Sequence, residues 1–113
     1  MRKPFKLRPD QFRPLAEGYG SCIASDRITI AGERVGYMYR EAPVKSIDSG
    51  WHFFSGDESQ DYVDDARNFE IFDVNTIANY DPEIIPLLDV EIGTAWARNV
   101  NGKFDREKLK PLN

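Results

Sequence analysis

The 113 residues are 41% hydrophobic and 12% aromatic, which is enough for the core of one folded domain and excludes a disordered chain. No apolar run approaches the ~20 residues of a membrane-spanning helix, and no apolar segment follows the basic start at Arg2 and Lys3, so neither a membrane protein nor a secreted one is expected. The single cysteine, Cys22, excludes an internal disulfide and a cysteine-rich zinc site, and the expected location is cytoplasmic.

The net charge of −4 is distributed unevenly along the chain. Residues 48–91 contain twelve Asp or Glu and one basic residue, Arg67, which gives this part a net charge of −11. A concentrated negative field attracts a basic protein and repels nucleic acid, so nucleic acid is not an expected partner. Two other interpretations stay open: these acids only face water, or the basic flanks of the same molecule neutralise them.

The first half of the chain predicts an extended segment followed by a sheet. Residues 1–20 contain three prolines and several basic side chains, which predicts an extended basic N-terminal segment. Alternation of apolar and polar residues then predicts short strands at 22–25, 28–30 and 35–40. A turn at Gly32 joins the last two as a hairpin, so we expect an antiparallel meander.

The next strand carries four ring-bearing residues in a row, at 51–54. Alternation places Trp51 and Phe53 on one face and His52 and Phe54 on the other, so one of the two pairs is expected in the core. A lone histidine in such a place is more often a hydrogen-bonded structural residue than a catalyst.

An acidic helix is predicted to follow this strand. Residues 55–58, Ser-Gly-Asp-Glu, have the spacing of a capping box and predict a helix from residue 56 to about residue 66. Like charges at spacings of three and four would then share one side of this helix: Asp57, Asp61, Asp64 and Asp65. Because like charges at those spacings repel, a cation or a basic partner would stabilise this side. The calcium-loop pattern is absent, so no metal is expected.

The last third predicts two short helices and a hairpin. A strand is expected at 69–72, a helix capped by Asp73, and a second short helix begun by Asp81 and Pro82. A long strand is expected at 91–98, and Asn101-Gly102 predicts a hairpin turn after it.

The expected fold is a single α+β domain with a mainly antiparallel sheet and a few short helices. It spans residues 21–104, between the N-terminal segment and a charged tail at 105–113.

Three stretches also carry a family resemblance: Val-Gly-Tyr-Met-Tyr-Arg-Glu at 35–41, Asp-Ser-Gly-Trp-His-Phe-Phe-Ser-Gly-Asp-Glu at 48–58, and Asn-Thr-Ile-Ala-Asn-Tyr-Asp-Pro at 75–82. In this order they resemble a bacterial family of immunity proteins from polymorphic toxin systems, number thirty-three in that series, first described as a domain of unknown function. The resemblance runs from about Ser21 to Phe104. It implies an α+β domain that binds and silences a toxin made by the same cell, and it supplies no residue roles.

The leading hypothesis is therefore a non-catalytic binding protein without a cofactor, whose partner is a cognate toxin protein; a basic toxin would fit the acidic residues. Aromatic anchors beside steering carboxylates suit such an interface. The expected binding residues are Trp51, His52, Asp57, Glu58, Asp61, Tyr62, Asp64 and Asp65. The alternative is a small enzyme or a ligand-sensing domain, in which one cluster performs acid–base chemistry. Its members would be Asp48, His52, Asp57 and Glu58.

Overall fold

A computed structural model describes residues 3–108, and within this range six strands form one sheet. The strands are β1 (Ser21–Ser25), β2 (Tyr37–Arg40), β3 (Asp48–Phe54), β4 (Phe69–Asp73), β5 (Thr94–Arg98) and β6 (Phe104–Glu107). Their order across the sheet is β4-β1-β3-β2-β5-β6, and every neighbouring pair is antiparallel except β1 and β3. The predicted α+β class and the mainly antiparallel sheet are confirmed.

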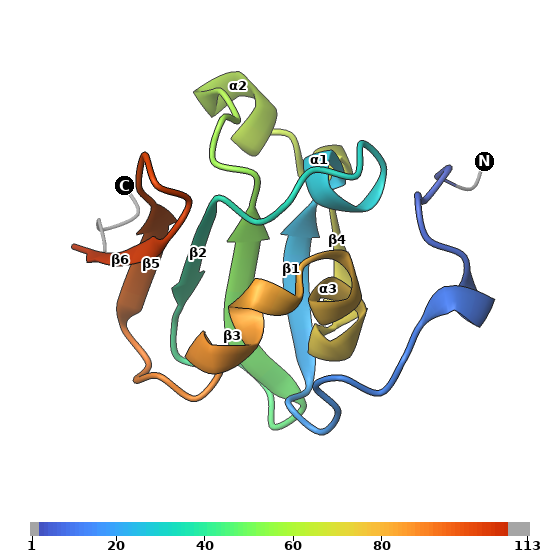
Figure 1. The fold of residues 1–113 in the computed structure, drawn as a ribbon, viewed down its shortest axis with the longest axis horizontal. Helices are drawn as coiled ribbons and strands as arrows, with labels where there is room; N and C mark the ends of the chain where they lie inside the picture. The colour runs from blue at the N-terminus through green and yellow to red at the C-terminus, as the bar shows by residue number, and fades with distance from the viewer. Residues whose placement is uncertain (1–2, 109–113) are drawn as a thin grey trace.

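Among the short helices of the chain, the α-helix α3 (Val74–Tyr80) and the 3-10 helix η3 (Pro82–Leu87) cover one face of this sheet. The other α-helices are α1 (Asp26–Thr29) and α2 (Gln60–Val63), and the other 3-10 helices are η1 (Pro9–Gln11) and η2 (Ala66–Asn68). In Figure 1, α3 and the turn that follows it lie in front of the sheet, while α2 lies beyond the ends of the strands. In the part of the chain that the structure describes, no helix is long and apolar enough to cross a membrane.

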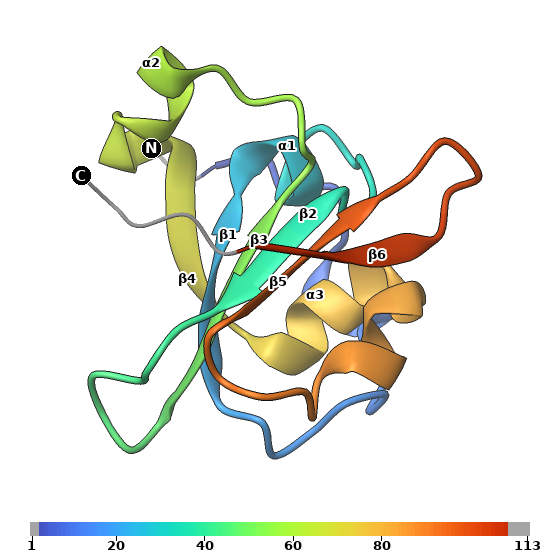
Figure 2. The same cartoon turned by 90° about the vertical axis from the view of Figure 1, so that its left-hand side faces the viewer.

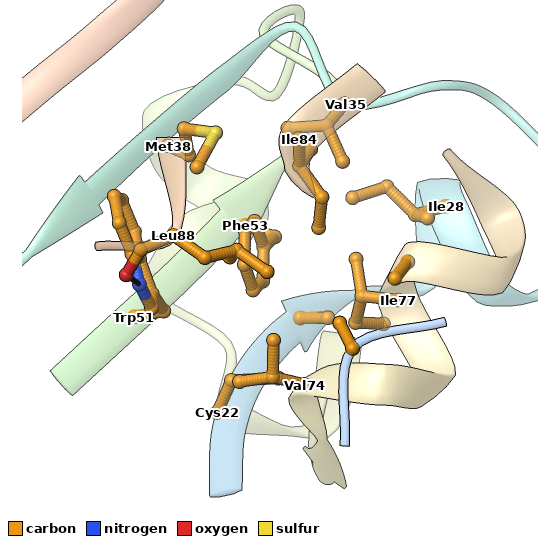
Figure 3. Close-up of a cluster of buried hydrophobic side chains, with 13 residues drawn as sticks. Cys22, Ile28, Val35, Met38, Trp51, Phe53, Val74, Ile77, Ile84 and Leu88 are labelled. Atoms are coloured by element: carbon orange, nitrogen blue, oxygen red, sulfur yellow. Dashed lines mark hydrogen bonds between the residues drawn. The ribbon is translucent and has the colours of Figure 1, made fainter. Parts of the chain in front are cut away.

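The hydrophobic core lies between the sheet and these helices. Trp51 and Phe53 point from β3 toward α3 and η3, and both are fully buried (Figure 3). The helices contribute Ile77 of α3 and Ile84 of η3, which are also fully buried. The predicted alternation along β3 is thus confirmed, with the Trp51 and Phe53 side in the core.

The predicted strand at 28–30 and its hairpin are wrong. Ser25 accepts a hydrogen bond from the amide of Arg27 and begins the single turn α1, which buries Ile28. β2 therefore has no strand at 28–30 to pair with. It pairs with β3 on one side and with β5 on the other. The β-branched residues at 28–30 are β-formers locally, but the cap and the burial of Ile28 override that preference.

The long acidic helix predicted after β3 is also absent. Glu58 does reach back to the amide of Ser55, as in a capping box, but the helix begins later, at Ser59, and α2 is one turn. The side chain of Ser59 accepts from the amide of Tyr62. Only Gln60–Val63 and the separate 3-10 turn Ala66–Asn68 are helical here, so the predicted charged side of one long helix does not form.

Three local signals of the last third are confirmed. Asp73 caps α3 by accepting from the amide of Asn75, and Asp81 caps η3 by accepting from the amide of Glu83. The turn that contains Gly102 joins β5 to β6 as a hairpin. In each case the residues that give the signal are neighbours in the chain, so distant contacts were not needed to predict it.

The N-terminal segment packs against the domain. Lys3 forms a salt bridge with Asp26, the amide of Leu7 donates to the hydroxyl of Tyr80, and the amide of Ala16 donates to the side chain of Asn75. These contacts hold it along α1 and α3, and Lys3 also donates to the carbonyl of Arg67. Of the predicted tail at 105–113, residues 105–107 belong to β6, and 109–113 lie outside the described residues.

Candidate functional site

Ring-bearing side chains line the sheet face that lies opposite the core. The pairing of β2 with β3 places Tyr39 beside His52 and Tyr37 beside Phe54, and Phe69 of β4 continues the row. The rings of Tyr39 and His52 are stacked with their centroids 4.5 Å apart, and Phe54 and Phe69 meet edge to face at 5.7 Å. We call these five residues the aromatic face. In Figure 2 this side lies away from α3.

His52 is held in place within the aromatic face. Its Nε2 lies 2.8 Å from Oε1 of Glu41, and its side chain is 16% exposed. Burial raises the pKa of Tyr39 to about 12, and the nearby Glu41 carboxylate adds to the rise. The phenol beside His52 is therefore neutral at physiological pH.

The aromatic face contains an open pocket of about 380 Å³. Apart from Tyr39, His52 and Glu70, the residues that line it are apolar. The residues that line it are Ile23, Tyr39, His52, Phe54, Val63, Ala66, Phe69, Glu70 and Ile71. A pocket of this composition suits an apolar side chain.

Two of the predicted acids are already paired with cations. Asp57 lies 3.2 Å from Nη1 of Arg27, and Asp65 lies 2.9 Å from Nη2 of Arg67. The same Arg27 guanidinium lies over the ring of Tyr62, 5.0 Å from its centroid. Tyr62 also meets Phe69 edge to face, so it joins the aromatic face as an additional ring.

The other three predicted acids are differently placed. Within residues 3–108, Asp61 and Asp64 are exposed and form no salt bridge; Asp64 accepts one hydrogen bond from Gln60. Glu58 accepts from the amides of Ser55 and Gly56. Among the described residues, Asp61 and Asp64 are therefore the two carboxylates of this group that are exposed and have neither a cation nor a backbone amide as a partner.

The Glu58 contacts predict a pH-dependent contribution to stability. Burial alone would raise the pKa of Glu58, but hydrogen bonds from the Ser55 amide and its other donors outweigh burial and lower the pKa. Because the folded pKa is the lower one, the stabilisation is complete above the unfolded pKa and is lost as the pH falls through the folded pKa. Urea unfolding at about pH 7 should show Glu58→Gln to be less stable than the wild type, with the gap closing in acid.

Asp61→Asn is the control, because that side chain accepts no hydrogen bond within the described residues. Its stability relative to the wild type should be nearly independent of pH. If the difference in the free energy of unfolding between the wild type and Glu58→Gln stays constant down to strongly acidic pH, the assigned hydrogen bonds are contradicted.

Trp51 requires a correction. It was expected to anchor a partner together with His52, but it is fully buried on the core face and its indole Nε1 donates to the carbonyl of Leu88. Neighbouring residues of a strand point to opposite faces, so Trp51 and His52 cannot share a surface. Its ring offers no area to a partner in this fold.

The structure does not assemble the predicted acid–base cluster. Asp48 lies at the start of β3 and accepts from the amide of Gly50, while His52 contacts Glu41. Asp57 and Glu58 lie beyond the other end of the strand. Among the described residues, no hydrogen bond joins any two of the four. The geometry therefore gives no support to the enzyme alternative.

The described residues are not arranged for metal binding or for thiol chemistry either. Within residues 3–108, no three His, Cys, Asp or Glu side chains are placed to hold one metal ion. Cys22 is buried, and burial raises the pKa of its thiol far above the usual range. A thiol in this state is a packing residue.

The candidate site contains residues that the sequence did not single out. Tyr39, Phe54, Phe69, Val63 and Ile71 line the pocket. The alternation at 51–54 had indicated which side each of those rings takes, but not that β2 and β3 are neighbours with Tyr39 opposite His52. Side chains that meet across distant strands leave no spacing signal in one sequence.

A family model described as the Immunity protein Imm33 domain matches residues 22–108. The chain belongs to the Imm33 family. The match extends from the second residue of β1 into the residue after β6, so it includes the sheet except Ser21, and the whole aromatic face. Comparisons with curated proteins and with solved structures return no significant match.

Membership of the Imm33 family supports a toxin-neutralising immunity role in general, and such a role implies binding to a cognate toxin. Immunity protein families are generally non-catalytic. The family resemblance of the three sequence stretches is confirmed. The Imm33 match begins after the N-terminal segment, so the surface that it includes is that of the sheet and its helices.

Proposed function

We propose that this protein neutralises its cognate toxin by direct binding, with the aromatic face and the adjacent acids as the contact surface. The observation that carries the proposal is the composition of the sheet face opposite the core. It presents an apolar pocket, and two carboxylates without a cation, Asp61 and Asp64, lie in and next to the α2 turn that supplies Val63 to the pocket wall.

Each part of this surface has a separate role in binding. Aromatic and aliphatic side chains in the pocket supply the area that loses water on contact, which is where most binding energy resides. Exposed charges at a rim mainly raise the association rate and select a partner of opposite charge. The fitting partner is therefore a toxin surface with an apolar side chain flanked by lysines or arginines, and occlusion of that surface silences it.

Reversal of the unpaired charges is expected to slow association. Asp61→Lys combined with Asp64→Lys should lower the association rate with the purified toxin by about tenfold or more at low ionic strength, with a smaller effect in high salt. Stopped-flow or surface-based kinetics measures this rate. Co-expression with the toxin encoded beside the gene measures whether the same variant still restores growth.

The control reverses two exposed acids elsewhere, Glu17→Lys combined with Glu91→Lys, which produces the same change in net charge. This control should lower the rate much less. Equal effects of the two double variants would show that only the net charge matters and that the proposed surface is wrong. A wild-type protein that neither binds the toxin nor restores growth would contradict the function itself.

A further inference from the structure

The two edges of the sheet are protected to different degrees. At one edge, β6 has four residues, of which Asp105, Arg106 and Glu107 are charged. Short edge strands with charged side chains resist pairing with another chain. At the other edge, β4 has the sequence Phe-Glu-Ile-Phe-Asp, without lysine, proline or bulge, and its central Ile71 is 71% exposed. The β4 edge therefore lacks most of the usual protection.

The backbone of Ile71 points outward at this edge. In the antiparallel pair of β1 and β4, the amide of Val74 donates to the carbonyl of Gly20, and Asp73 lies opposite Ser21. Because hydrogen-bonded pairs alternate along an antiparallel ladder, Phe72 and Glu70 bond to β1, while the amide and carbonyl of Ile71 face away from it. Lys3 approaches the carbonyl of Phe69 but not that of Ile71.

Apolar cavities flank the Ile71 side chain on the same sheet face. One is the pocket of the aromatic face described above. The other, of about 260 Å³, lies between Ile71 and the loop that joins β2 to β3, and includes Val44 and Ile47. These two loop residues are 87% and 69% exposed. Alternate side chains of an added strand would point toward this face and could occupy both cavities.

We propose that the toxin pairs an extended segment with the outer edge of β4 and so adds a strand to the sheet. This inference rests on the proposed function and specifies how the toxin is held. Main-chain hydrogen bonds to Ile71 supply part of the affinity, and the cavities beside it select the side chains of the segment. Glu70 and Asp73 are exposed on the same strand, so the segment carries basic residues next to its apolar ones.

Charge distinguishes a toxin segment from a second copy of this chain. Two β4 strands paired in parallel would set Glu70 against Glu70 and Asp73 against Asp73; in either direction the pair gathers four acids, and β4 contains no basic residue to compensate. Like charges facing each other across strands are destabilising. A basic segment of another protein meets no such repulsion.

The experiment compares a backbone change with a side-chain change at the same position. Ile71→Pro removes an amide that makes no bond within the sheet, and proline is tolerated at edge strands. We expect Ile71→Pro to weaken binding of the purified toxin by about tenfold, and Ile71→Ala to weaken it less, in titration calorimetry. Arg106→Pro is the matched control, because its amide likewise points outward, at the β6 edge, and it should bind as the wild type does.

Hydrogen exchange of the wild-type complex gives a second readout that does not depend on how well the proline variant folds. The Ile71 amide should exchange quickly in the free protein and slowly in the complex. Unchanged exchange at Ile71 on binding, or equal losses for Ile71→Pro and Ile71→Ala, would overturn the strand pairing while leaving the toxin-binding function intact. A dimer of the chain alone that is lost in Ile71→Pro would assign the edge to a second copy instead.

Discussion

Arg98→Ala is expected to lower the free energy of unfolding by about 3–5 kcal/mol, the usual effect of removing one partner of a buried ion pair. The Arg98 side chain is 8% exposed and lies 2.6 Å from Asp81, whose side chain is 5% exposed. Arg98 also donates to the carbonyls of Val35 and Gly102, and its guanidinium lies over the ring of Phe104. The truncation would leave the Asp81 carboxylate buried without its cation.

Urea unfolding measures this effect, and Arg106→Ala is the control because Arg106 is exposed on the adjacent strand β6. The control should change stability by no more than about 0.5 kcal/mol. If Arg98→Ala fails to fold, Asp81→Asn tests the same pair with the guanidinium kept. Equal stabilities of the Arg98 and Arg106 variants would show that the pair contributes nothing beyond a surface arginine.

Trp51→Ala is expected to cost a similar amount, about 3–5 kcal/mol, because it removes a large buried ring and leaves a cavity that the neighbouring helices fill only in part. The ring is fully buried, is stacked against Phe53 at 5.7 Å, and lies near Arg40, whose guanidinium carbon is 5.8 Å from its centroid. The indole also loses its hydrogen bond to Leu88. The effect is measured by urea unfolding.

The apolar control is Ile71→Ala, which removes an exposed side chain and should change stability by no more than about 0.5 kcal/mol. Trp51→Phe, which keeps a buried ring, should retain most of the stability and serves if the alanine variant does not fold. The contradicting result is a Trp51→Ala protein that has wild-type stability but binds the toxin more weakly. It would show that Trp51 belongs to the contact surface and not to the core.

The features that the sequence predicted well are those set by neighbouring residues. The caps at Asp73 and Asp81 and the turn at Asn101-Gly102 depend on side chains within a few positions of the backbone groups they affect. Alternation separated Trp51 from His52 in the same way, although only the fold shows which side is the core.

The errors arise where local signals compete or where distant strands meet. Ser55 and Ser59 both have the chemistry of a helix cap, and the sequence favoured the first, whereas the structure uses the second. The strand predicted at 28–30 gave way to a buried turn. The pocket itself depends on β2, β3 and β4 being brought together in one sheet, which no spacing in a single sequence encodes.

The parallel pair formed by β1 and β3 has a consequence for the order in which the molecule folds. β1 ends at Ser25, yet both of its partners lie later in the chain, in β3 and in β4, which ends at Asp73. Contacts between segments so far apart require large loops to close first, which slows folding. The hairpin of β5 and β6 can form quickly and locally. One edge of β1, by contrast, stays open until β3, which ends at Phe54, is available, and the other edge stays open until β4 is complete at Asp73. During synthesis on the ribosome, β1 is therefore exposed to unwanted pairing until two much later segments of the chain have been made.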